Sequence, residues 1–413
     1  MNLVGGVVLA AMLMDVLVNG IADYLNLRRL APELPRPFQG YYDPDTYRRS
    51  QVYLKVNTRF SWISHIFQLL VILLFWFSGG FELLDSWVRE LNPNPVVRGL
   101  LFIGTLGIGM GLVSLPFGIY HTFVIEERFG FNRTNWRTFI LDKIKGLCLT
   151  AILGVPLLAG ILTFFQYTGA NAWWYCWAAV TAYMLVVQFI APTLIMPLFN
   201  KFVPLGDGKL KSAIVDYARS IQFPVKNIMV MDGSRRSAKS NAFFTGFGKN
   251  KRIVLFDTLI EKHSVPELVA VLAHEMGHYK KKHIMTMLIA GILQSGLMFF
   301  LLSFFLSYRG LYEAFYLTQP SIYAGLVFFA MVYSPLEFFL GLFRQILSRR
   351  NEYAADRFAA DTTRTPVAMV QALKKLSVHN LSNLTPHPFY VYLNYSHPPV
   401  LERITALEAP NPG

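Results

Sequence analysis

Two histidines and a glutamate stand within one helical turn in the segment "LAHEMGHYK", residues 272–280. On an α-helix, His274 and His278 lie on one face and one turn apart, so both imidazoles can bind the same tetrahedral zinc ion. Glu275 points about 100° away from His274. That direction keeps it out of the ligand set but close enough to act as a general base toward an attacking water. The segment therefore predicts a hydrolytic metal site.

The residues before this segment predict the helix that carries it. Ser264 is the expected N-cap, Glu267 follows three residues later as its capping-box partner, and Pro266 stands in the first turn. The alternative is a surface helix with incidental histidines. It is disfavoured because this pattern is rare by chance and here falls on a capped helix.

A catalytic zinc site needs a third protein ligand and one open position. The segment "RRNEYAADRFAAD", residues 349–361, places Glu352 and Asp356 on one helix face. We predict that Glu352 is the third ligand and that Asp356 orients a ligand histidine through its other ring nitrogen. Alternatively, the two acids only offset neighbouring arginines on a solvated helix. We interpret His283, which follows three lysines, as an interface residue.

The composition predicts an α-helical multi-pass membrane protein. Hydrophobic residues make up 54% of the 413 residues, charged residues make up 15%, and the mean hydropathy is +0.38. Crossing a hydrocarbon core takes roughly 20 apolar helical residues. Seven stretches are long enough, near residues 3–22, 60–83, 99–124, 147–168, 172–198, 284–308 and 321–347.

The net charge of +13 would suggest a nucleic-acid partner in a soluble protein. Here nearly all lysines and arginines fall in alternate loops, which indicates a lipid bilayer as the partner and no nucleic acid. The positive-inside rule predicts an external N-terminus and a cytoplasmic location for residues 199–283 and for the C-terminus. Cys148 and Cys176 lie inside predicted spans and suggest no disulfide.

The chain divides into four predicted parts. Helices one to five with their loops occupy 1–198, a cytoplasmic catalytic segment occupies 199–283, helices six and seven occupy 284–347, and a cytoplasmic tail occupies 348–413. Within the catalytic segment, "NAFFTGFGKNKRIVLFDTLI" contains two strand-like runs, and Gly248 and Asn250 suit a tight hairpin turn between them.

The segments "LVAVLAHEMGHYK", "RRNEYAADRFAA", "SNAFFTGFGKNKRIVLFDTLI", "MPLFNKFVPL" and "SHPPVLERI" together resemble the type I CAAX prenyl protease family. These are integral-membrane zinc metalloproteases of the gluzincin type. The resemblance implies seven transmembrane helices that form a barrel around a chamber, with a zincin-like domain on the cytoplasmic side. It also implies one zinc ion held by His274, His278 and Glu352, with Glu275 as general base.

The same resemblance assigns roles to two further places. In "SHPPVLER", His397 and Arg403 are expected to stabilise the oxyanion or hold the substrate backbone. Without that context, a histidine before two prolines is more often a loop residue. The other place resembles a substrate-binding edge strand, to which a peptide would add as an extra strand. Its residues are Asn241, Ala242, Phe243 and Phe244. An ordinary hairpin strand is the alternative.

The expected activity is removal of the C-terminal tripeptide from prenylated CAAX-type peptides, in a bacterial inner membrane or an endoplasmic reticulum membrane. Three alternatives remain open. The first is a membrane quality-control protease without prenyl specificity. The second is an intramembrane site-two protease with Asp232 of "MDG" on the metal, which the polar surroundings of Asp232 disfavour. The third is a transporter with a structural zinc, although such a site is usually closed by four protein ligands.

Overall fold

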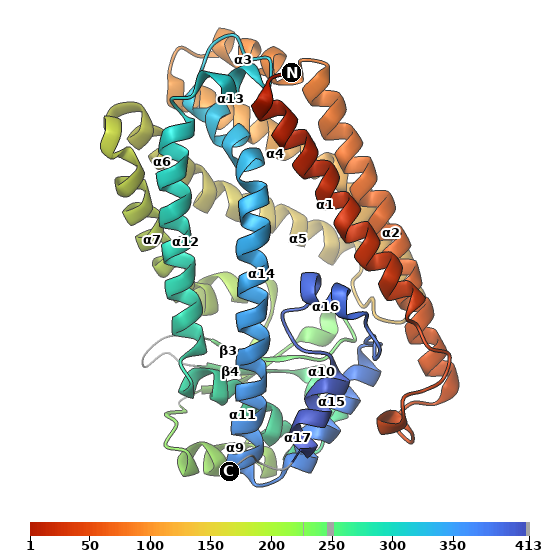
Figure 1. Cartoon of the computed structure of the whole chain (residues 1–413). Coiled ribbons are helices and arrows are strands. Elements are labelled where there is room, and N and C mark those ends of the chain that lie inside the picture. The colour runs from red at the N-terminus through yellow and green to blue at the C-terminus, as the bar shows by residue number, and fades with distance from the viewer. Residues whose placement is uncertain (226, 246–251, 410–413) are drawn as a thin grey trace.

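Seven long apolar helices make up most of the chain (Figure 1). The computed structural model describes residues 1–225, 227–245 and 252–409. In that part of the chain, the helices long and apolar enough to span a membrane are Leu3–Arg28, Pro44–Phe77, Pro95–Glu126, Trp136–Tyr167, Ala172–Phe199, His283–Phe305 and Ile322–Thr363. Their number agrees with the seven spans predicted from the sequence. They form a barrel, and the strands and most of the shorter helices gather at its lower end in Figure 1, whereas α3 (Gly80–Leu91) and α13 (Arg309–Glu313) lie at its upper end.

Three of the spans are composite helices with π-helical segments. The third span is α4 (Pro95–Tyr120) followed by the π-helical segment His121–Glu126. The fourth span joins α5 (Trp136–Leu149) to α6 (Val155–Tyr167) through the π-helical segment Thr150–Gly154. The fifth span joins α7 (Ala172–Ile190) to α8 (Met196–Phe199) through the π-helical segment Ala191–Ile195. Pro156 lies two residues after the end of the second π segment, and Pro192 lies in the third. Because a proline donates no backbone N–H, the helix changes its hydrogen-bond pattern at these points.

The predicted limits of the second span were wrong. The helix α2 covers Pro44–Phe77, starting well before residue 60 and ending before residue 83. Gly79 then takes a left-handed conformation with φ of 75°, and α3 (Gly80–Leu91) starts in a new direction. Hydropathy alone did not register this break, because α3 also contributes apolar side chains, among them the buried Leu84 and Val88. The fourth span likewise begins earlier than predicted, at Trp136.

The helices that carry the predicted ligands are α11 (Val265–Lys280) and α14 (Ile322–Thr363). The capping box at the start of α11 is present as predicted, and the backbone N–H of Ser264 donates to the Glu267 carboxylate at 2.8 Å. Lys282 adopts a left-handed conformation between α11 and α12 (His283–Phe305). The last span continues through residue 348 without a break, so the spanning helix itself presents Glu352.

A four-stranded sheet lies against α11. The strands are β1 (Phe202–Pro204), β2 (Asn227–Met231), β3 (Ala242–Thr245) and β4 (Arg252–Phe256), in the order β1-β2-β4-β3. β3 pairs antiparallel with β4, with Ala242 opposite Leu255, which confirms the two strands of the predicted hairpin. Its predicted turn residues, Gly248 and Asn250, lie outside the described residues. β3 occupies the edge of the sheet, so one side of it pairs with no other described strand.

The remaining helices complete the core around this sheet and the ends of the barrel. They are α1 (Leu3–Arg28), α9 (Lys209–Ser220), α10 (Asp257–Lys262), α13 (Arg309–Glu313), α15 (Pro366–His379), α16 (Pro388–Asn394) and α17 (Val400–Glu408). Leu255 of β4 and Leu272 of α11 are almost fully buried between the sheet and the helices. On the spans, large apolar side chains such as Leu74 and Phe343 stay exposed, as expected for helices that cross a membrane.

Close packing of α11 on α14 depends on Gly277. A Cβ atom at this position would lie 3.0 Å from Phe358 Cδ1 and 3.3 Å from the Cα of Ala355. The second contact is with helix backbone, which cannot rotate away. Gly277 therefore allows the two helices to approach closely beside the predicted metal ligands.

We predict that Gly277→Val separates α11 from α14, destabilises the fold by about 1–3 kcal/mol and lowers metal occupancy. Thermal unfolding and metal analysis of the purified protein measure both effects. Gly104→Val is the matched control, because a Cβ at Gly104 in α4 would meet nothing within 4 Å. Unchanged metal content and unfolding temperature in Gly277→Val would show that the close approach is not required.

Candidate active site

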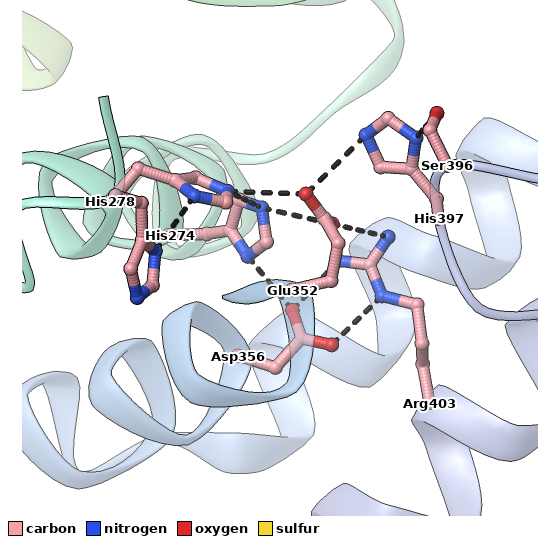
Figure 2. Close-up of polar contacts among 8 residues, drawn as sticks. His274, His278, Glu352, Asp356, Ser396, His397 and Arg403 are labelled. Atoms are coloured by element: carbon pink, nitrogen blue, oxygen red, sulfur yellow. Dashed lines mark hydrogen bonds and ion pairs between the residues drawn. The ribbon is translucent and has the colours of Figure 1, made fainter. Parts of the chain in front are cut away.

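His274 and His278 face the same point from successive turns of α11. Their Nε2 atoms lie 3.1 Å apart, and their ring planes are inclined at 82° (Figure 2). Two neutral imidazole nitrogens this close repel each other unless a proton or a cation lies between them. The arrangement therefore fits two ligands that share one cation, as the sequence predicts.

Glu352 completes the group from α14. Its carboxylate oxygens lie 3.4 Å from His274 Nε2 and 3.2 Å from His278 Nε2. Its Oε2 atom is buried without a hydrogen-bond donor in the described structure. One atom from each of the three side chains lies within 4.8 Å of the other two. The three side chains thus offer two nitrogens and one carboxylate, and one oxygen of that carboxylate has no hydrogen-bond donor among the described residues. This donor set fits a divalent metal such as zinc.

Asp356 lies one turn beyond Glu352 and contacts the other side of His274. Its Oδ1 atom is 2.8 Å from His274 Nδ1, the contact expected of a carboxylate that fixes the ring orientation and tautomer. Arg403 donates to both oxygens of the same carboxylate, from Nε at 2.7 Å and from Nη2 at 2.6 Å. Its Nη1 atom lies 3.6 Å from Glu352 Oε2. Arg403 therefore positions Asp356 and places positive charge beside Glu352.

His397 approaches the group from the side opposite His274 and remains accessible. Its Nε2 atom lies 3.4 Å from Glu352 Oε1, and 63% of its side chain is exposed. Its Nδ1 atom is within 2.9 Å of the Ser396 hydroxyl. The structure thus separates the two residues predicted from "SHPPVLER": Arg403 is bound to Asp356, whereas His397 presents its ring to the open side of the group (Figure 2).

Glu275 is half-buried beside the two histidines. Burial raises the pKa of its carboxyl above the ordinary value, and the nearby His274 and His278 rings partly oppose that shift. A raised carboxyl pKa suits a group that must first accept a proton and then return it.

His283 contacts His278, the second predicted ligand. The sequence analysis did not predict this contact. Its Nδ1 atom is 3.1 Å from the Nδ1 atom of His278, so it can orient that ring in the way that Asp356 orients His274. The signal was a third histidine five residues after His278. The left-handed conformation of Lys282 ends α11 and turns His283 back toward the site. Helical periodicity cannot predict such a turn.

The predicted substrate-binding residues 241–244 lie at the start of β3 and along it. The Phe244 ring packs 5.6 Å from the ring of Tyr279 on α11, so the edge strand runs beside the helix that carries the histidines. The amide of Asn380, a residue the sequence analysis did not single out, contacts the backbone N–H and C=O of Ser240 at 3.2 and 3.4 Å. Asn380 therefore holds the chain in place just before the edge strand.

Family models match nearly the whole chain. Residues 23–201 match the CAAX prenyl protease N-terminal region, described as five membrane helices, and residues 204–411 match peptidase family M48. The chain belongs to the CAAX prenyl protease family within family M48. It is a multi-pass membrane metallopeptidase.

Individual relatives agree with this assignment. The chain is 37% identical to a CAAX prenyl protease 1 homolog of Oryza sativa, over 93% of both proteins, and 34% identical to CAAX prenyl protease 1 of Saccharomyces cerevisiae, over 91% of this chain and 88% of the relative. The crystal structure of S. mikatae Ste24p superimposes with a TM-score of 0.90 at 33% identity, over 99% of each chain. The predicted barrel and family are therefore confirmed.

The assignment also bears on two alternatives. Membership of a peptidase family excludes the reading of the chain as a transporter with a structural metal. Asp232, the residue that suggested a site-two protease, accepts a hydrogen bond from the backbone N–H of Lys201 at 2.7 Å. It is not part of the His274, His278 and Glu352 group.

We predict that Glu352→Gln removes most of the bound metal, because a neutral amide is a poor third ligand. Asp356→Asn should weaken metal affinity by only ~10- to 100-fold, because it removes the orienting acceptor and leaves the ligands in place. Metal content after dialysis against a graded chelator measures both effects. Asp361→Asn, an exposed acid on the same helix, is the control. If Asp356→Asn loses metal and Glu352→Gln keeps it, the two roles are exchanged.

Proposed function

We propose that this chain is a zinc-dependent endopeptidase that removes the C-terminal tripeptide from prenylated CAAX-type peptides. The main support for a metal site is that His274, His278 and Glu352 converge and that the Oε2 atom of Glu352 is buried without a hydrogen-bond donor in the described part of the chain. The substrate class comes from the relatives, whose names describe them as CAAX prenyl proteases.

His274, His278 and Glu352 would hold the zinc ion, and the donor set leaves one position open for water and substrate. When bound, zinc supplies Lewis-acid chemistry: it polarises the scissile carbonyl and makes a water acidic enough to attack near neutral pH. Asp356 and His283 would keep the two imidazoles aligned through their Nδ1 atoms.

Glu275 would move the protons. It would accept one from the attacking water and return it to the nitrogen of the leaving amine, so that the peptide bond breaks without releasing an unstable amide anion. His397 would donate from Nε2 to the oxyanion, since its ring is accessible and lies beside Glu352. Arg403 would act mainly through Asp356 and through its charge near Glu352.

A peptide would bind as an additional strand along the free edge of β3, at residues Asn241–Phe244. Edge pairing uses main-chain hydrogen bonds and therefore tolerates different side chains. The prenyl group would lie in apolar surroundings, where each buried CH₂ contributes about 0.8 kcal/mol.

We propose that the site faces the cytoplasm and that the N-terminus lies outside, because the basic residues gather in the loops on the side of the sheet. Single cysteines replacing Glu90 and Arg309, in a chain whose two native cysteines are serines, should react with an impermeant reagent outside sealed vesicles of native orientation. A cysteine replacing Lys209 should not. Reaction at residue 209 alone would reverse the orientation.

Glu275→Gln should retain the metal and lose activity by at least ~100-fold, because the amide cannot accept the proton. Peptide cleavage and metal content are measured on the same preparation. Glu261→Gln, in the short helix α10, is the control for loss of one charge in the same region. Loss of metal in step with activity would assign Glu275 a structural role.

The substrate proposal is tested with one CAAX peptide in farnesylated and unmodified forms. The purified enzyme should release the last three residues of the farnesylated form and cut the unmodified form more slowly, and mass spectrometry of the products identifies the bond. If it cuts neither form but degrades unfolded membrane proteins, the chain is a quality-control protease and the prenyl specificity is wrong.

A further inference from the structure

Three arginines converge at the start of the fourth span, away from the residues that bind the metal. Arg133 lies just before α5, Arg137 is the second residue of α5, and Arg235 comes from the turn that follows β2. They line one pocket of about 530 Å³, together with Asn135, Thr138 and Leu141.

Backbone contacts hold these two segments together. The backbone N–H of Arg133 donates to the carbonyl of Arg236 at 3.1 Å, and Asn132 forms a β-bridge with Ser237. In the turn after β2, the backbone N–H of Ser234, next to Arg235, donates to the Asp257 carboxylate at 2.9 Å and holds that turn in place. The fold therefore brings Arg235 beside Arg133 and Arg137, although about 100 residues separate it from them in the sequence.

Within the described ranges of the chain, Arg133, Arg137 and Arg235 have no carboxylate partner, unlike the neighbouring Arg236. Arg236 donates to both oxygens of Asp142, at 2.7 and 2.8 Å, so this carboxylate is already occupied. Among the residues that the structure describes, Arg133, Arg137 and Arg235 form no ion pair with a carboxylate. Three like charges around one pocket repel each other, and an anion in the pocket would relieve that repulsion.

The surroundings of the pocket are those of a membrane interface. Trp136 is 54% exposed and stacks on Phe123 with ring centroids 4.0 Å apart. Tryptophan is enriched at the headgroup level of membranes. From the pocket, α5 continues with exposed Leu141, Ile144 and Leu147, which form an apolar stripe along the helix. The arginines thus lie where a headgroup would be and the apolar stripe where its acyl chain would be.

We propose that this pocket binds the phosphate headgroup of an anionic glycerophospholipid, with one acyl chain along the exposed face of α5. Arginine binds phosphate oxygens through paired N–H groups, and basic pockets at the ends of membrane helices suit such headgroups. A bound lipid here would join the fourth span to the turn after β2, and thereby the barrel to the sheet beside α11.

The test is native mass spectrometry of the full-length protein in detergent, titrated with phosphatidylglycerol or with phosphatidylcholine of the same chain length. The wild type should bind one phosphatidylglycerol in preference to phosphatidylcholine. The triple variant Arg133→Gln, Arg137→Gln, Arg235→Gln should lose that preference, with affinity lower by at least ~10-fold, since each arginine contributes roughly fivefold.

The control variant replaces three other exposed arginines with glutamine, Arg48, Arg219 and Arg364, and should bind phosphatidylglycerol like the wild type. If the triple variant does not elute as a single folded species, Arg137→Gln alone should lower affinity roughly fivefold.

Equal binding by the triple variant and the wild type would overturn the proposal, as would equal binding of the two lipids. Displacement of phosphatidylglycerol by an equal concentration of inorganic phosphate would also overturn it, because the pocket would then be a site for free phosphate.

Discussion

The close contact between α11 and α14 is the constraint on which the rest of the structure depends. Two of the proposed metal ligands come from one of these helices and the third comes from the other, so the three side chains meet only where the helices approach each other. Gly277 allows that approach, because any side chain there would meet the backbone of α14. The same helix α14 crosses the membrane, and the spacing of the ligands is therefore coupled to the packing of the barrel.

The groups around the ligands make this arrangement specific. Asp356 contacts His274, and His283 contacts His278, each through the ring nitrogen that points away from the group. Arg403 neutralises Asp356, which would otherwise be a second buried carboxylate near Glu352. The site is thus a connected set of charges, in which the removal of one partner leaves another uncompensated.

The parts that could be predicted from the sequence have short-range causes. The capped helix of His274 and His278 follows from local hydrogen bonding and helical spacing, and the seven spans follow from hydropathy. Glu352 could be placed because its helix continues directly from the last span. The limit of the second span was missed, since hydropathy does not register a left-handed residue such as Gly79 between two apolar stretches.

The role of His283 could not be predicted, because it depends on how the chain turns at Lys282 before the next span begins. The meeting of Arg133 with Arg235 depends on two segments that pair only in the folded chain. Likewise, no pattern in the sequence distinguishes the role of His397 from that of Arg403. That difference arises because Asp356 binds one of them and leaves the other accessible.

The most direct test of the central claim is X-ray absorption spectroscopy at the zinc edge of the purified, metal-loaded protein. The expected spectrum is that of one zinc ion bound by two imidazole nitrogens at about 2.0–2.1 Å and by oxygen from one carboxylate and an exchangeable water. In Glu352→Gln, any zinc that remains bound should lack the carboxylate contribution. A spectrum with four protein ligands and no exchangeable position, or with sulfur ligands, would contradict the proposed active site.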